Sequence, residues 1–322
     1  MKALLVNNLK AGQGDARLFD YIRELNVRGV EVTLRSIGGD RTLEHGLRDA
    51  EDYDRVVTAG GDGTASAAAY LLRNTGVPLL PYPAGTANLL AMNLGIPLEP
   101  ARCADATLNG RTVRVDLGEL SYENAGRPPG GNERRRIARP GVATRMGFAM
   151  MAGAGFDANI MHGAERLKDQ IGAGAYLIAA VQNLEPQMAT ITLDLDGKTV
   201  ETEGSAVLLL NFARIQFDLS IAHESDPTDG RFEVVVIKAK HMTELLPVLM
   251  AAFLDRIVTF PDRTQWLDTY SAKRVEIRSE PALPLQSDGD ALGGVTPLSG
   301  RVLPKAATFV IPENAPIPGQ IP

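Results

Sequence analysis

The sequence is poor in aromatic residues and in cysteine. Aromatic side chains make up 5% of the 322 residues, and Cys103 is the only cysteine. A lone cysteine excludes a disulfide framework and a cysteine-based zinc site, and it is typical of a reducing compartment. The histidines are scattered without the spacing of metal ligands, so we assign them no metal or base role: His45, His162, His223 and His241.

Long apolar runs and an excess of basic residues are also missing. The longest apolar stretch, near residues 245–260, is interrupted by Pro247 and by Asp255 and Arg256, whereas a membrane helix needs roughly 20 apolar residues. The N-terminus has no signal-peptide pattern. Lysine and arginine total 33 against 39 acidic residues, giving a net charge of -6. Non-specific nucleic-acid binding needs a basic surface, so we expect no nucleic-acid partner. Because neither a membrane helix nor a signal peptide is indicated, we expect a cytoplasmic protein.

Glycine and proline are abundant, at 32 and 20 residues. A chain of 322 residues favours two domains, since one domain averages about 150 residues. Short apolar runs alternate with amphipathic segments in the first third, which is typical of βαβ units around a parallel sheet. Strands are expected at 3–6, 30–34, 55–59 and 77–80, and helices at 15–27, 42–50, 65–73 and 89–94.

After about residue 115 the pattern changes to that of a mostly β domain. Strands are expected at 146–151, 190–195, 206–210, 232–237 and 306–311, helices at 172–184 and 242–255, and a long loop at 121–141. Asp196-Gly197 is a hairpin signal between two alternating runs. The sequence therefore predicts a nucleotide-binding α/β domain over 1–115 and a β-rich domain over 116–304, with residues 305–322 able to return to the first.

A glycine-rich loop, Gly60 to Thr64, lies between an expected strand and an expected helix. Its backbone N–H groups can face phosphate oxygens at the positive end of the helix. Asp62 would repel a bare phosphate, but it suits Mg²⁺ or a water network; the alternative is a tight turn with Asp62 as a helix cap. A second loop, Pro83 to Asn88, follows the next strand, and neighbouring parallel strands bring such loops together. No Walker motif and no GxGxxG are present, which disfavours P-loop and dehydrogenase interpretations.

These motifs resemble the diacylglycerol kinase catalytic-domain family, which includes bacterial lipid kinases and sphingosine kinases. The GGDGT segment alone is shared with NAD kinases, and a close variant with phosphofructokinases. The PxGTxN loop and the late Asp-Gly pairs favour the lipid branch. The matching segments follow in order along nearly the whole chain: 60–64, 83–88, 94–97, 152–157, 226–230 and 286–290.

The resemblance implies a Rossmann-like or phosphofructokinase-like three-layer α/β domain and a C-terminal β-sandwich, with the active site in the cleft between them. ATP would bind there, and Asn88 would lie close to its base or ribose. Ser36 would match a family threonine at the nucleotide site. Residues implied to hold the nucleotide phosphates are Gly60, Gly61, Asp62, Gly63, Thr64 and Thr86.

The resemblance also implies the acidic residues of the site. Asp62 would organise the catalytic Mg²⁺. Asp290 would be the base that accepts the hydroxyl proton, at a position where glutamate is more usual in the family. Asp226, Asp229 and the backbone of Arg231 would hold a structural Mg²⁺.

The implied activity is transfer of the γ-phosphoryl group of ATP to a lipid hydroxyl, by an ATP:lipid phosphotransferase. Diacylglycerol, a sphingoid base and phosphatidylglycerol are all open as acceptors; an NAD kinase and a non-catalytic nucleotide or lipid sensor are the alternatives. Two departures from the family pattern stand out. Leu89 replaces an aspartate, and the segment 7–12 lacks the usual proline and serine, although Lys10 and Arg17 are available near the phosphates.

A basic run at 133–139 is the expected place for contact with anionic headgroups, although a solvated loop is the simpler interpretation. We therefore expect transient attachment to the inner face of the membrane, and a homodimer is left open. Four methionines could line an acyl-chain cleft, and core packing explains them equally well: Met146, Met150, Met151 and Met161.

Overall fold

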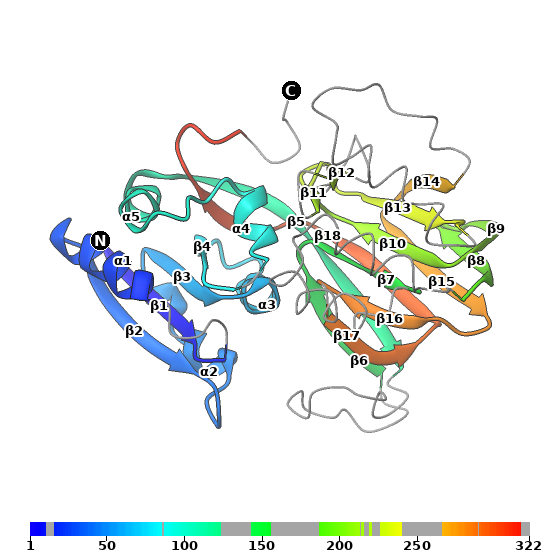
Figure 1. The fold of residues 1–322 in the computed structure, drawn as a ribbon, viewed down its shortest axis with the longest axis horizontal. Helices are drawn as coiled ribbons and strands as arrows, with labels where there is room; N and C mark the ends of the chain where they lie inside the picture. The colour runs from blue at the N-terminus through cyan, green and yellow to red at the C-terminus, as the bar shows by residue number, and fades with distance from the viewer. Residues whose placement is uncertain are drawn as a thin grey trace, which may run out of the picture.

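The computed structural model describes residues 1–10, 16–85, 87–123, 143–155, 187–212, 214–215, 219–220, 226–239, 266–288 and 290–316. These residues form an N-terminal α/β lobe and a C-terminal β lobe that lie side by side (Figure 1). The helices expected at 172–184 and 242–255 lie outside the described residues.

Four parallel strands form the centre of the N-terminal lobe, in the order β2-β1-β3-β4. Their apolar residues are buried, as in Ala3 to Val6 of the first strand, because helices cover a parallel sheet on both faces. The strands are β1 (Lys2–Asn8), β2 (Glu31–Ile37), β3 (Arg55–Gly60) and β4 (Leu79–Pro83).

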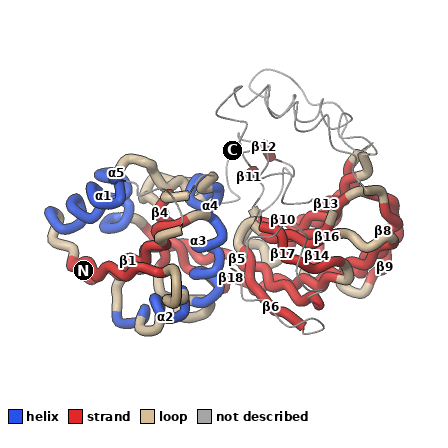
Figure 2. Tube along the Cα trace, turned by 60° about the horizontal axis from the view of Figure 1, so that its bottom comes forward, coloured by secondary structure: helices blue, strands red, loops and turns tan. Residues whose placement is uncertain are grey.

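The helices of this lobe form two groups. In Figure 2, α1 and α5 lie together above the sheet and α2 lies below it. α3 contacts both α2 and α4. The helices are α1 (Ala16–Val27), α2 (Leu43–Leu47), α3 (Asp62–Leu71), α4 (Leu89–Asn93) and α5 (Pro100–Asn109), with a 3-10 turn η1 (Ala50–Asp52).

Two expected helices differ in detail. The segment expected as one helix at 42–50 is split into α2 and η1, while Thr42 caps α2 by accepting a hydrogen bond from the His45 N–H at 3.3 Å. α3 begins at Asp62 rather than at residue 65, because Gly61 already occupies the N-cap position in an extended conformation. The last part of the glycine-rich segment is therefore helical.

The C-terminal lobe is a sandwich of antiparallel strands. One layer is a six-stranded sheet in the order β14-β13-β10-β7-β16-β17. Phe148 and Phe232 stack between the layers with ring centroids 5.4 Å apart. The six strands are β7 (Met151–Ala154), β10 (Ala206–Leu210), β13 (Phe232–Ile237), β14 (Leu267–Ala272), β16 (Pro284–Ser287) and β17 (Asp290–Val295).

The other layer of the sandwich is continuous with the sheet of the N-terminal lobe, which gives one ten-stranded sheet. β18 starts beside β15 and ends beside β4, where Phe309 pairs with Leu79. Its partner β5 follows it along most of this length. The remaining strands are β5 (Arg111–Glu123), β6 (Ala143–Phe148), β8 (Ala189–Leu195), β9 (Lys198–Gly204), β15 (Arg274–Glu280) and β18 (Leu298–Ile311), with a small pair β11 (Arg214–Ile215) and β12 (Leu219–Ser220).

Three sequence expectations change in this lobe. The strand expected at 146–151 is divided between β6 and β7, which belong to different sheets, so residues 149 and 150 form a corner. Residues 121–123, expected in a loop, extend β5 by pairing with β6. β18 begins at Leu298 rather than at residue 306, because its first half pairs with β15 and β5. The division at residue 115 stays a prediction, since β5 runs through it.

None of the helices among the described residues is both long and apolar enough to span a membrane.

Candidate active site

The glycine-rich loop joins the end of β3 to the start of α3. A Cβ atom on Gly60 would lie 2.7 Å from the Cβ of Thr64, so only glycine fits beside that threonine. Thr64 Oγ1 in turn accepts a hydrogen bond of 2.8 Å from Nδ2 of Asn8, at the end of β1. The loop is therefore tightened by its own threonine and tied to the neighbouring strand.

The second loop lies against the first. A Cβ atom on Gly85 would lie 2.5 Å from the Cα of Gly61, which is too close for any side chain. Asn88 has a left-handed backbone with φ of 52°. Its side-chain oxygen accepts from the Gly85 N–H and its amide donates to the Gly85 carbonyl, both at 2.8 Å. Asn88 thus closes this loop on itself, and its expected nucleotide contact stays a prediction. Thr86 lies outside the described residues.

Asp62 connects the first loop to α4. Its Oδ1 accepts the N–H of Leu90 at 2.8 Å, which satisfies a backbone donor that the start of a helix leaves unpaired. Leu89, which stands where the family has an aspartate, is partly buried and packs against the core of the N-terminal lobe. The position therefore contributes apolar packing instead of a carboxylate.

Asp290 brings the C-terminal lobe to the glycine-rich loop. It is the first residue of β17 and pairs with Ser287 across the hairpin. A Cβ atom on Gly63 would lie 3.3 Å from Oδ2 of Asp290, so the carboxylate lies directly against the start of α3. The structure places this predicted base beside the predicted phosphate loop, although the two are far apart in the sequence.

Asp288 is a half-buried neighbour of this site that the sequence analysis included only within the matching segment 286–290. Its carboxylate accepts a hydrogen bond from the Ser66 hydroxyl of α3. It also accepts from the backbone N–H groups of Ala149 at 3.2 Å, Met150 at 3.0 Å and Met151 at 3.0 Å. Burial raises the pKa of Asp288 to about 6, although these hydrogen bonds act in the opposite direction. The only sequence signal was its position two residues before Asp290.

A second contact between the lobes lies one turn further along α3. Tyr70 Oη donates to Glu119 Oε2 of β5 at 2.6 Å, and Arg301 Nη2 of β18 pairs with Glu119 Oε1 at 2.6 Å. Burial alone would raise the pKa of Glu119, but the hydrogen bonds from Tyr70 and Arg301 lower it below its ordinary value. Serine and tyrosine four residues apart lie on one helix face, so this face of α3 joins the two lobes.

The predicted structural-metal residues lie in a tight turn before β13. Asp226 Oδ1 accepts from the backbone N–H of Thr228 at 2.8 Å, and Asp229 Oδ1 accepts from that of Arg231 at 2.8 Å. Burial, followed by the charge of Asp226, raises the pKa of Asp229. In the part of the chain that the structure describes, no three His, Cys, Asp or Glu side chains are grouped closely enough to hold a metal by themselves.

Asp116 of β5 lies beside this turn. Its Oδ2 accepts the N–H of Gly230 at 2.6 Å, and its Oδ1 accepts that of Lys305 at 2.6 Å. Burial raises the pKa of Asp116, and the charges of Asp229 and Asp226 add to the shift. The turn is therefore fixed to β5 and to β18 by a carboxylate that the sequence analysis did not single out.

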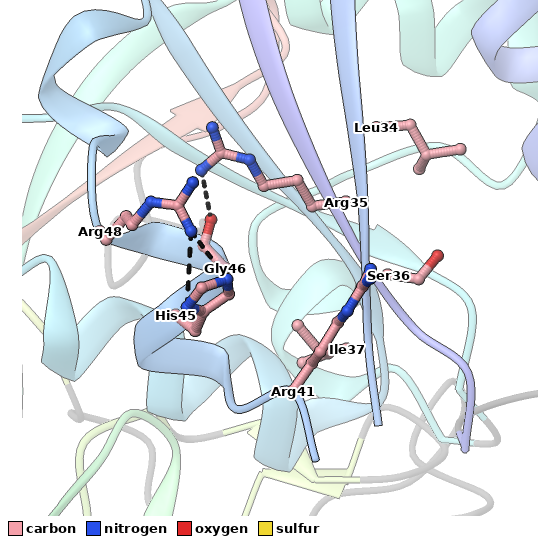
Figure 3. Close-up of a pocket in the computed structure, with 8 residues that line it drawn as sticks. All are labelled: Leu34, Arg35, Ser36, Ile37, Arg41, His45, Gly46 and Arg48. Atoms are coloured by element: carbon pink, nitrogen blue, oxygen red, sulfur yellow. Dashed lines mark hydrogen bonds between the residues drawn. The ribbon is translucent and has the colours of Figure 1, made fainter. Parts of the chain in front are cut away.

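Ser36 lies in a separate hollow of about 390 Å³ at the carboxyl end of β2 (Figure 3). Ser36 pairs with Asn7 of β1, and Asn7 pairs with Ala59 of β3, so the hollow and the glycine-rich loop share one edge of the sheet. Three arginines are among the residues that line it: Leu34, Arg35, Ser36, Ile37, Arg41, His45, Gly46 and Arg48.

The cations of this hollow are unequally paired. Arg35 forms a bidentate pair with Asp49, in which Nη2 and Oδ2 are 2.8 Å apart. Arg48 Nη1 lies 2.7 Å from Nε2 of His45 (Figure 3).

Comparison with known proteins agrees with this architecture. Residues 2–120 match the model for the diacylglycerol kinase catalytic domain, and residues 150–311 match that for the YegS C-terminal NAD kinase beta sandwich-like domain. A diacylglycerol kinase of Mycobacterium tuberculosis is 28% identical over 299 residues, which cover 90% of this chain and 88% of the relative. An uncharacterised protein of Synechocystis is 27% identical over 331 residues, which cover 97% of this chain and 70% of the relative.

Solved structures show the same fold. The crystal structure of a diacylglycerol kinase from Bacillus anthracis superposes with a TM-score of 0.66 over 96% of both chains, at 18% identity. The expected α/β domain followed by a β-sandwich is confirmed by this match and by the two domain models. The chain belongs to the family that joins a diacylglycerol kinase catalytic domain to a YegS-type C-terminal β-sandwich.

Proposed function

We propose that this protein is an ATP-dependent lipid kinase that transfers the γ-phosphoryl group to the hydroxyl of a lipid. The observation that carries the proposal is the position of the Asp290 carboxylate against Gly63 in the glycine-rich loop. A carboxylate beside a phosphate loop is the pair of groups that phosphoryl transfer to a hydroxyl requires. The diacylglycerol kinase relatives support the same activity.

The groups of the site divide the tasks of this mechanism among them. The loop between β3 and α3 presents backbone N–H groups and the positive end of α3 to the nucleotide phosphates. Gly61 and Gly85 keep the two loops free of side chains, so that phosphate can approach the backbone. Asp290 accepts the proton of the attacking hydroxyl. Asp62 holds the start of α4 through Leu90 and fixes the second loop relative to the first.

Mg²⁺ would neutralise the charge that develops on the transferred phosphoryl group. Asp62 is the residue of the loops suited to holding it, because it supplies the carboxylate oxygens that Mg²⁺ prefers. A structural Mg²⁺ would be held by Asp226 and Asp229 with the main chain of Arg231. Burial and the neighbouring charge of Asp226 raise the pKa of Asp229 and so disfavour its ionised form. A bound cation would offset the negative charge of the two carboxylates, so these residues fit a metal ion.

The structural Mg²⁺ is testable without turnover. Titration of nucleotide-free protein with MgCl₂ should raise the melting temperature, since a ligand at 100 times its Kd stabilises by about 2.7 kcal/mol. Asp229→Asn should remove this response, and Asp105→Asn, on the exposed side of α5, should retain it. An equal response in both variants would place the binding of Mg²⁺ elsewhere.

We further propose that the enzyme reaches its substrate at a membrane surface. The basic run at 133–139, on which this idea depends, lies outside the described residues, as does Met161. Met150 is buried in the core of the N-terminal lobe and Met146 packs against the core of the C-terminal lobe. Packing therefore accounts for these two methionines without an acyl chain.

The kinase assay uses labelled ATP, Mg²⁺ and vesicles carrying diacylglycerol, a sphingoid base or phosphatidylglycerol, with the wild type, Asp62→Asn and Asp290→Asn. We expect transfer to one of these lipids by the wild type and loss of transfer in both variants. Phosphorylation of NAD in the absence of vesicles would instead identify an NAD kinase, the candidate favoured by the NAD kinase beta sandwich-like C-terminal domain. Binding of ATP in a calorimeter without transfer to any acceptor would indicate a sensor.

A further inference from the structure

Asp288 joins three segments that are far apart in the sequence. Its carboxylate lies between Ser66 of α3 and the corner at residues 149–151, where the chain passes from β6 to β7. Its own backbone N–H donates to the Met151 carbonyl at 2.8 Å. One side chain of the C-terminal lobe therefore fixes a helix of the N-terminal lobe and the crossing between the two sheets of the sandwich.

The hydrogen bonds around this carboxylate form a closed set. Oδ1 accepts the N–H groups of Met150 and Met151, whereas Oδ2 accepts from Ser66 and from the N–H of Ala149. Ser66 Oγ also accepts the Ala149 N–H at 2.9 Å, so the serine hydroxyl is shared between the lobes. Four donors match the acceptor capacity of an ionised carboxylate, and they fix its orientation.

This contact lies next to the reacting groups. Ser66 follows Gly63 by three residues in the same helix, and Asp288 precedes Asp290 by two in the same hairpin. The Gly63–Asp290 approach and the Ser66–Asp288 hydrogen bond therefore connect the same two elements. If β17 shifted along α3, the distance between Gly63 and Asp290 would change only after the Ser66–Asp288 hydrogen bond had broken.

Stability alone does not explain a carboxylate here. Asp288 is half-buried; withdrawing a charge from water costs free energy, and an apolar pair of similar volume often stabilises a protein equally well. Burial raises the pKa of Asp288 to about 6, which shows that this cost is present. The lobes are already joined a turn away by Tyr70, Glu119 and Arg301. Asp288 adds directional hydrogen bonds, which fix the position of the hairpin relative to α3 more narrowly than apolar contacts would.

We propose that Asp288 is a positioning residue that, through Ser66 and the corner at 149–151, holds Asp290 at a fixed distance from the phosphate loop. The proposal rests on the proposed function, in which Asp290 is the base. Asp288 itself touches no reacting atom. Its effect should appear in kcat, since misplacing a catalytic group by about 1 Å can cost 100-fold in rate, and the Michaelis constant for ATP should stay nearly constant.

The test compares Ser66→Ala, Asp288→Asn and Asp288→Ala with Tyr70→Phe, which weakens the other contact of α3 with the C-terminal lobe. We expect kcat to fall roughly 10-fold to 100-fold in Asp288→Ala and Ser66→Ala, with KM for ATP changed less than about twofold. Asp288→Asn should retain part of kcat, because its amide can accept from Met150 and Met151 and donate to Ser66. Tyr70→Phe should lower the melting temperature and leave kcat unchanged.

Two outcomes would overturn the proposal: an unchanged kcat in Ser66→Ala, or a fall in kcat in every variant that merely follows its melting temperature. Hydrogen–deuterium exchange provides a readout independent of turnover. The amides of residues 149–151 should be protected in the wild type and exchange faster in Ser66→Ala and Asp288→Asn, but not in Tyr70→Phe. If the wild type transfers phosphate to no acceptor, the proposed function fails. Hydrogen–deuterium exchange then still tests whether Asp288 fixes the corner at 149–151. Unaltered exchange of these amides in both Ser66→Ala and Asp288→Asn would reject that role as well.

Discussion

The two lobes contribute to the site in opposite ways. The N-terminal lobe provides backbone from which side chains are excluded, as where Gly85 lies against Gly61 and Gly60 against Thr64. The C-terminal lobe provides carboxylates, of which Asp290 lies against Gly63 and Asp288 is enclosed by donors. Substitutions that add atoms should therefore impair the N-terminal side of the site, and substitutions that remove a charge should impair the C-terminal side.

The largest effect should come from removing the charge of Asp290. Asp290→Asn keeps the shape of the side chain but cannot accept a proton, and loss of a general base typically costs roughly 10²-fold to 10⁴-fold in rate. We expect kcat for the lipid acceptor to fall by this amount in steady-state assays, while calorimetry shows unchanged ATP binding. Asp105→Asn is the matched control on an exposed helix face. Weakened ATP binding in Asp290→Asn would contradict the division of tasks between the lobes.

Adding one methyl group to the N-terminal side should have the next largest effect. In Gly85→Ala the new Cβ would lie 2.5 Å from the Gly61 Cα, and overpacking of this kind typically costs 1–3 kcal/mol, here about the upper end. We expect a lower melting temperature together with weaker nucleotide binding in a calorimeter. Gly61→Ala is the matched control, because its Cβ would lie 3.9 Å from the Gly85 Cα, an ordinary van der Waals distance. It should lower the melting temperature less than Gly85→Ala does. Equal losses of stability in the two variants would show that steric exclusion between the loops is unimportant.

A smaller effect, spread over pH, should come from Asp288. Burial raises its pKa from 3.8 to about 6, so the folded protein binds this proton more tightly than the unfolded chain. The resulting stabilisation is complete below pH 3.8 and is lost as the pH rises through about 6. Asp288→Asn has no such proton. Its free energy of unfolding relative to wild type, measured by urea denaturation, should increase across this window and stay constant above it. A difference independent of pH would place the titration on another group.

The sequence predicted best what depends on neighbouring residues. β10 and β13 match the expected strands residue for residue, since alternating or continuous apolar runs define a strand locally. The Asp196-Gly197 hairpin is confirmed by positive φ values of 55° and 91°. The apolar run before the glycine-rich segment and the alanine-rich run after it placed that segment between a strand and a helix. Its glycines indicated a close approach of backbone, as is seen between Gly85 and Gly61.

What the sequence could not predict depends on register between distant segments. Nothing around Ala149 and Met150 indicated a corner, because its backbone donors are satisfied by Asp288, far away in the sequence. The length of β18 was underestimated for the same reason, since Leu298 is paired by β15 and β5. Asp288 itself lay within the matching segment 286–290, but nothing in the sequence showed that its carboxylate would meet Ser66 and the backbone of residues 149–151.

The smallest effect should come from the contact that joins the lobes away from the reacting groups. Tyr70→Phe removes one hydrogen bond to Glu119, whose other oxygen remains paired with Arg301. A hydrogen bond to a charged group contributes about 1.5–3 kcal/mol, and the remaining pair with Arg301 should hold the loss near the lower limit. Thermal and urea denaturation should show this loss, with kcat unchanged. Because Ser66 and Tyr70 lie on the same face of one helix, the two substitutions differ mainly in their distance from Gly63. A fall in kcat on Tyr70→Phe as large as that on Ser66→Ala would mean that catalysis depends on joining the lobes at all, and not on the register that Asp288 sets.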